Sequence, residues 1–123
     1  MSVTFLRIAV VYLVLGALLG LGMGITERFT LAPVHAHLLL LGWASLALAG
    51  IVYHLHPAAA QTRLARLHFW LHNAGLPVFM VGLAMLLSGT AGATPVVALA
   101  ATVVLAGLVL FAANVLVNVR AGT

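Results

Sequence analysis

Four apolar segments determine what this chain can fold into. They cover about residues 3–24, 33–56, 67–87 and 95–119, and each is close to the ~20 apolar residues that a helix needs to cross a lipid bilayer. Of the 123 residues, 65% are hydrophobic and only 5% are charged, which is too few charges to cover a soluble domain. The sequence therefore predicts an all-α membrane protein, in which residues 1–123 form a single four-transmembrane-helix bundle.

The composition excludes several classes of function. The chain has no cysteine, so disulfides, thiolate metal sites and cysteine nucleophiles are excluded. Glu27 is its only carboxylate side chain, so one chain cannot form the carboxylate pair of a hydrolase. The net charge of +4 does not indicate nucleic-acid binding, because the arginines are scattered at the ends of the predicted helices. The loops are short, so any chemistry must lie between the helices.

The arginines predict the orientation in the membrane. With four spans, both termini and the central loop lie on one side. That side carries four of the five arginines: Arg7, Arg63, Arg66 and Arg120. The other side carries Arg28 beside Glu27. Positive residues concentrate in the cytoplasm, so we expect a multi-pass protein of a bacterial-type inner (cytoplasmic) membrane, with both termini cytoplasmic.

A His-Ala-His sequence near the start of the second span is the strongest candidate for a cofactor site. His35 and His37 are expected toward the outer side, in an apolar helix where an ionisable residue indicates function. Positions i and i+2 of a helix point ~200° apart, so the two imidazoles cannot close on one ion from one face. Histidine is a usual axial ligand of haem iron, and a groove between apolar helices suits a haem. We therefore predict that at least one of His35 and His37 binds a cofactor, with haem as the candidate.

The other four histidines are expected toward the inner side, and two interpretations of them stay open. His68 and His72 are spaced i, i+4 and share a helix face, which is suitable for chelating copper or zinc. His54 or His56 would then complete a three-imidazole metal site. In the other interpretation, His54, His56 and His68 are anchors at the membrane interface, where rings with polar tips are common.

Helix geometry separates the two groups of histidines. His35 and His54 lie roughly 28 Å apart along a helix that rises ~1.5 Å per residue, about the thickness of the hydrocarbon core. His37 and His72 lie near opposite ends of antiparallel helices, so one cofactor cannot link them within a chain. A six-coordinate haem on the outer side therefore takes its second axial ligand from another subunit, or lacks one.

A wider pattern surrounds the histidines of the second and third spans. A His-x-His pair followed by Gly and a His-x-x-Pro ending is formed by His35, His37, Gly50, His54 and Pro57. The third span begins with His68, Phe69 and, further on, Gly75. Over about residues 33–87, this pattern resembles the tenth and eleventh transmembrane helices of haem–copper oxidase subunit I. The resemblance implies that His35 faces the place of the high-spin haem and His37 that of the low-spin haem.

The resemblance also implies an assembly. Subunit I consists of three four-helix arcs around a pseudo-threefold axis, and a stand-alone four-helix chain resembles one arc. We therefore expect a homo-oligomer, most simply a trimer, in which histidines of neighbouring subunits hold a haem. The family's His-Pro-x-x-Tyr motif is absent from this sequence, and no acidic or lysine-lined proton path is visible. Oxygen reduction and proton pumping are therefore not predicted.

Together with this resemblance, the patterns predict a membrane protein that binds a b-type haem through His37, with His35 as a second ligand or support. Its role would be in electron transfer or in gas- and redox-related chemistry, with a redox partner. Two alternatives stay open: a copper- or zinc-binding membrane protein that uses the inner-side histidines, and a structural or assembly module without a cofactor. Whether the chain is an enzyme is also left open. The missing oxidase motifs favour a non-enzymatic role, since catalysis would need a haem with an open axial position.

Overall fold

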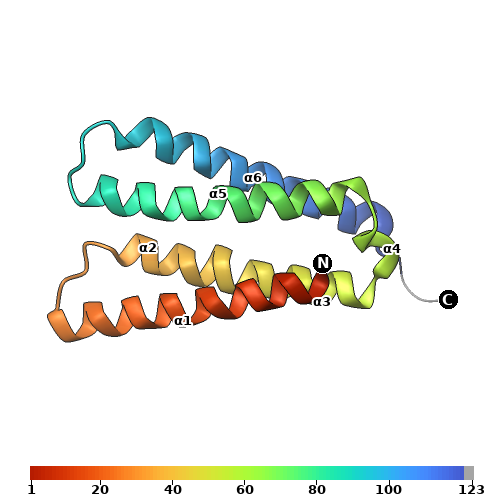
Figure 1. The fold of residues 1–123 in the computed structure, drawn as a ribbon, viewed down its shortest axis with the longest axis horizontal. Helices are drawn as coiled ribbons and strands as arrows, with labels where there is room; N and C mark the ends of the chain where they lie inside the picture. Colours follow the sequence, from red (N-terminus) through yellow and green to blue (C-terminus); the bar gives the residue numbers. More distant parts are fainter. Residues whose placement is uncertain (121–123) are drawn as a thin grey trace.

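The computed structural model describes residues 1–120, which form helices joined by short loops (Figure 1). In chain order the helices are α1 (Ser2–Thr26), α2 (Ala32–His37), η1 (Leu38–Ala44), α3 (Ser45–Leu55), α4 (Pro57–Ala60), α5 (Arg63–Leu87) and α6 (Ala93–Asn118). Residues 1–120 contain no β-strand. The predicted all-α fold is confirmed.

Four helical stretches are long and apolar enough to cross a membrane. They are Ser2–Thr26, Ala32–Leu55, Arg63–Leu87 and Ala93–Asn118, and the second combines α2, η1 and α3. Large apolar side chains are exposed along all four of these stretches, as lipid-facing surfaces require; Leu116, for example, is 84% exposed. The chain is therefore a multi-pass membrane protein with the four candidate spans that its apolar segments predict.

Local sequence explains where several helices begin and end. Pro33 and Pro57 lie in the first turns of α2 and α4, where a missing amide proton costs no intrahelical hydrogen bond. The Thr62 hydroxyl caps α5 by accepting the Ala65 amide at 3.1 Å. Glu27 ends α1 in the left-handed conformation, with φ at 54°.

The helices form two antiparallel hairpins that lie side by side (Figure 1). The first pairs α1 with the α2–η1–α3 span, and the second pairs α5 with α6. Met1, α4 and the C-terminal end of α6 lie at one end of the molecule, called here the basic end. The arginines toward this end are Arg7, Arg63, Arg66 and Arg120. The two hairpin loops lie at the opposite end, called here the neutral end because it carries Glu27 beside Arg28.

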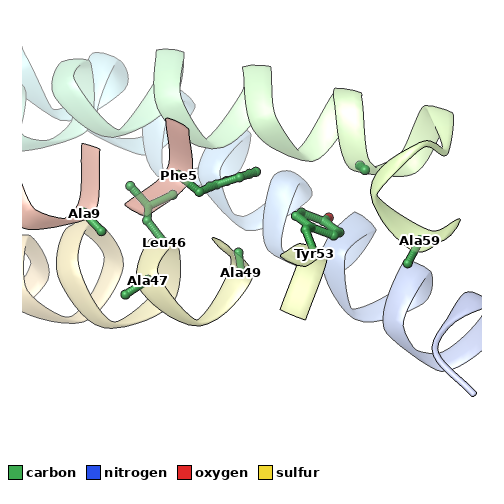
Figure 2. Close-up of a cluster of buried hydrophobic side chains, with 8 residues drawn as sticks. Phe5, Ala9, Leu46, Ala47, Ala49, Tyr53 and Ala59 are labelled. Carbon is green, nitrogen blue, oxygen red and sulfur yellow. The ribbon is translucent and has the colours of Figure 1, made fainter. Parts of the chain in front are cut away.

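Two clusters of buried side chains join the hairpins. The cluster toward the basic end contains Phe5 and Tyr53, which lie between the hairpins in Figure 2. Phe5 of α1 packs edge-on against Phe69 of α5, with 5.2 Å between ring centroids. The second cluster includes Val34 of α2 and Leu76 of α5. Because lipid is as apolar as these side chains, the clusters stabilise the fold through van der Waals packing rather than through removal of water.

Glycine allows close helix contact at several places, of which Gly42 and Gly107 are examples. A Cβ at Gly42 would lie 2.5 Å from Cγ of Tyr12, so α1 and η1 approach each other through this glycine. A Cβ at Gly107 would lie 3.2 Å from the backbone nitrogen of His72, which places α6 directly against α5 at that histidine. Small residues at such contacts are typical of membrane helix packing.

The second span is not uniformly α-helical. Leu38–Ala44 is a π-helix, in which an amide bonds to the carbonyl five residues earlier instead of four. The Ser45 amide bonds to the Leu40 carbonyl, and the Ser45 hydroxyl donates to the same oxygen at 2.8 Å. Such segments take up one more residue than an α-helix of equal length, and they occur often at functional sites. Nothing in the sequence Leu38–Ala44 predicts this change of pairing.

Candidate functional site

His35 is seated in a notch on α1. Its Nδ1 lies 2.8 Å from the Gly16 carbonyl oxygen, and an added Cβ at Gly20 would lie 2.6 Å from its Cε1. Since a carbonyl oxygen only accepts hydrogen bonds, the proton is on Nδ1 and Nδ1–H donates. In the neutral ring, Nε2 then carries a free lone pair. No hydrogen bond within residues 1–120 uses this Nε2.

His37 has the same arrangement on another side of the helix. Its Nδ1–H donates to the Pro33 carbonyl at 2.6 Å, and its ring packs edge-on against Phe79 of α5 at 5.2 Å between centroids. Its Nε2 also has no protein partner among the described residues. His35 thus faces α1 while His37 faces α5, so the pair does not close on one ion. An Nδ1–H held by a backbone carbonyl is the usual support of a metal-bound histidine.

A mostly apolar groove opens at the neutral end, and the His35 side chain is not part of its lining. It has a volume of about 450 Å³, and its lining includes Leu19, Met23 and Leu31 together with Arg28. The His35 amide donates to the Leu31 carbonyl at 3.0 Å, so His35 lies one helical turn from the groove lining on the same face. An apolar groove with an arginine at the membrane surface suits a flat apolar ligand that carries carboxylates.

Between the hairpins, Tyr53, His68 and His72 are buried and joined by hydrogen bonds into one row, called here the buried chain. The Tyr53 hydroxyl lies 3.0 Å from Nδ1 of His68, and Nε2 of His68 lies 3.2 Å from Nδ1 of His72. The chain ends at the Leu41 carbonyl oxygen, 2.8 Å from Nε2 of His72. The three side chains are at most 1% exposed. The chain therefore joins α3, α5 and η1 inside the protein.

The carbonyl at the end fixes the direction of every hydrogen bond in this chain. Because the Leu41 oxygen only accepts, Nε2 of His72 carries the proton and Nδ1 of His72 accepts. Nε2 of His68 then donates to that Nδ1, and Nδ1 of His68 accepts from the Tyr53 hydroxyl. All four ring nitrogens of His68 and His72 therefore have a hydrogen-bond partner. Both rings are neutral in this arrangement, so the buried chain places no charge in the core.

The π-helix supplies the carbonyl that ends the chain. The Ser45 amide bonds to the Leu40 carbonyl, five residues earlier, and the amides after it bond to carbonyls four residues earlier. Where the spacing changes from five to four, one carbonyl receives no amide of its own helix. Leu41 is the next carbonyl along the helix, and His72 is its donor. A carbonyl left unsatisfied in hydrocarbon costs several kcal/mol, which this bond offsets.

The structure does not bring His54, His56, His68 and His72 together. No three His, Cys, Asp or Glu side chains within residues 1–120 are placed to hold one metal ion. His54 is exposed in the last turn of α3, and His56 is half-buried between α3 and α4. His68 and His72 alone are in contact, and they bond to each other. The interpretation of His68 as an interface anchor is wrong, because its side chain is 0% exposed.

Sequence inspection missed the groups that hold the histidines. No motif links Tyr53 to His68, and the carbonyls of Gly16 and Leu41 carry no mark in the sequence. The four-residue spacing of Gly16 and Gly20 is the one available signal, since small-xxx-small patterns indicate close helix contact. Comparisons with protein families, with curated proteins and with solved structures found no match to this chain.

Proposed function

We propose that this chain is a haem-binding integral membrane protein with a role in electron transfer, and that His37 and His35 are its haem ligands. The observation that carries the proposal is the state of these imidazoles. Each is anchored through Nδ1 on a backbone carbonyl and keeps its Nε2 free in an apolar span. Neutral imidazole is a common axial ligand of haem iron. A polar nitrogen without a partner in hydrocarbon is unfavourable, so a ligand would supply the missing interaction.

The groove at the neutral end supports the same ligand. Leu19, Met23 and Leu31 offer apolar contact to a b-type haem, and Arg28 offers a cation to its carboxylates. When bound, the haem supplies a one-electron redox centre. The chain holds and orients it and keeps water away. Kinship with haem–copper oxidase subunit I is part of the proposal and rests on sequence spacing alone.

The divergence of His35 and His37 supports an oligomer. One chain cannot give both imidazoles to one haem, since one ring lies against α1 and the other against α5. Two axial imidazoles would come from neighbouring copies in a cyclic homo-oligomer, most simply a trimer. In the same proposal the basic end lies in the cytoplasm of a cell with a bacterial-type inner membrane, with both termini cytoplasmic, because positive residues favour that side.

Absorption spectra of the purified protein test the haem site. After expression with ample haem, we expect a Soret band and, after dithionite, an α band. His37→Ala and His35→Ala are expected to lose or shift these bands. Thr102→Val is the control, since that hydroxyl bonds only to Ala98 of its own helix. A wild-type protein without a Soret band contradicts the proposal, and the mass of the solubilised complex tests the trimer.

One observation favours a second candidate, a copper- or zinc-binding membrane protein. The 3.2 Å between Nε2 of His68 and Nδ1 of His72 is close to the ~3.3 Å expected for two imidazoles on one tetrahedral ion with metal–nitrogen bonds of ~2.0–2.1 Å. The other ring nitrogens bond to Tyr53 and Leu41, as metal ligands often do. Elemental analysis of wild type and His72→Ala decides, because equal metal content in both removes this site.

A further inference from the structure

We propose that His72, oriented by His68, is a positioning residue for the haem ligands. By donating to the Leu41 carbonyl it holds η1 in its π-helical form, and η1 sets the direction in which His35 and His37 point. The inference rests on the proposed ligand role of those two histidines. It gives a role to His68 and His72 of α5, neither of which bonds to His35 or His37.

The π-helical segment controls the rotation of α2 relative to α3. One residue of α-helix advances the chain by ~100° and ~1.5 Å. Because Leu38–Ala44 takes up one residue more than an α-helix of the same length, a return to α pairing would turn α2 by about 100° relative to α3. His35 would then leave the space beside Gly20, and its Nδ1 would lose the Gly16 carbonyl.

The Leu41 carbonyl is the point at which the two forms of the segment compete. In α pairing, this oxygen would receive an amide of its own helix. In the π form, it needs a donor from elsewhere, and the donor in the structure is Nε2 of His72. The π form is therefore favoured only while His72 holds its proton on Nε2 and points at η1.

The surroundings of His72 fix both of those conditions. The bond from His68 to Nδ1 of His72 requires the proton of His72 to be on Nε2. The ring of His68 is itself held between Phe5, at 5.2 Å, and Phe111, at 4.9 Å between centroids. Gly107 lets α6 press against the His72 backbone. The donor is thus aimed by packing on three helices before any ligand binds.

Nitrogen NMR of the histidine-labelled protein in lipid bilayers tests this inference without haem. In the wild type, we expect Nδ1–H rings at His35 and His37, an Nε2–H ring at His72, and a dipolar contact between that Nε2 and the labelled Leu41 carbonyl. His72→Leu is expected to remove the Nδ1–H signal of His35 and to weaken haem binding at least tenfold. His72→Gln is expected to restore both, because an amide offers an acceptor to His68 and a donor to Leu41.

Deletion of Leu40, an exposed residue of η1, tests the helical register directly. With the extra residue removed, the segment can form a regular α-helix while α2 keeps its present direction. Every carbonyl of the segment then receives an amide of its own helix, and no donor from His72 is needed. The deletion combined with His72→Leu is therefore expected to recover the His35 signal that His72→Leu alone removes. Asn73→Leu, a neighbouring change on α5 outside the chain, is the control and is expected to leave that signal unchanged.

The outcomes separate this inference from the haem proposal. If the His35 signal responds to His72→Leu but the wild type binds no haem, the positioning role stands and the haem proposal fails. If haem binds and His72→Leu changes neither the His35 signal nor the haem affinity, the positioning role is overturned. If His72→Leu does not fold, the wild-type contact between His72 and Leu41 and the His72→Gln variant decide, and absence of that contact overturns the inference.

Discussion

The two pairs of histidines in the spans both bond to backbone carbonyls, but with opposite results for their remaining ring nitrogens. His35 and His37 each give Nδ1–H to a separate backbone carbonyl, which leaves one free nitrogen on each ring. His68 and His72 share a single carbonyl at the end of a chain, and all four of their nitrogens are used. The first pair is available to a ligand, whereas the second pair is closed within the protein.

The spacing of each pair explains the difference. Residues at i and i+2 of a helix point to different sides, so His35 and His37 meet different neighbours and cannot bond to each other. Residues at i and i+4 stack on one face, so His68 reaches His72 at 3.2 Å. The bond between the two rings uses the lone pair of His72, and the Tyr53 hydroxyl uses that of His68. A pair at i and i+2 cannot form such a bond between its own rings.

The largest expected contrast between the pairs is in stability. His72→Leu leaves the His68 Nε2–H without a partner, and the Leu41 carbonyl regains one only by α pairing, which leaves the His35 Nδ1–H without its own. We therefore expect a loss of about 2–4 kcal/mol in unfolding free energy, at ~1–3 kcal/mol for each orphaned group. His35→Ala removes a single bond from a half-buried ring and is expected to cost about 1 kcal/mol. Unfolding by dodecyl sulfate in one detergent compares them, and equal losses would contradict the contrast.

These contrasts also show how far the sequence alone reaches. Apolar length and the scarcity of charge predict the four spans, because a bilayer imposes the same requirement along each segment. The divergence of His35 and His37 and the contact of His68 with His72 follow from helix periodicity. The π-helix at Leu38–Ala44 does not follow, since it depends on a donor thirty-one residues further along the chain that satisfies the Leu41 carbonyl. Tertiary contact, rather than local propensity, decides that segment.

The next contrast concerns the notch that holds His35. In Gly20→Ala, the added Cβ would lie 2.6 Å from Cε1 of His35, so the ring must shift from its present position beside the Gly16 carbonyl. We expect haem affinity to fall at least tenfold. Gly24→Ala is the matched control one turn further along α1, where an added Cβ meets nothing within 4 Å, and it is expected to bind haem normally. Haem titrations of both variants make the comparison, and equal affinities would mean that the notch does not position His35.

A smaller effect is expected where the buried chain begins. Tyr53→Phe keeps the ring in its cluster but removes the donor to Nδ1 of His68. We expect a loss of about 1 kcal/mol in unfolding free energy. The haem spectrum should not change, because the Leu41 carbonyl still fixes the proton of His72. A spectral change as large as that of His72→Leu would show instead that the Tyr53 hydroxyl, rather than the Leu41 carbonyl, fixes the direction of the hydrogen bonds in the buried chain.

The smallest effect is expected at Asn73, the neighbour of His72 that belongs to neither pair. Its Nδ2 donates to the Phe69 carbonyl of its own helix at 2.8 Å, while its Oδ1 is the one buried side-chain polar atom without a partner in residues 1–120. Asn73→Leu removes this orphaned acceptor together with a dispensable bond. We therefore expect a change within about 0.5 kcal/mol in unfolding free energy, or a slight gain. A loss above ~1 kcal/mol together with dissociation of the oligomer would mean that Oδ1 accepts from a neighbouring copy, so that α5 lies at the subunit interface.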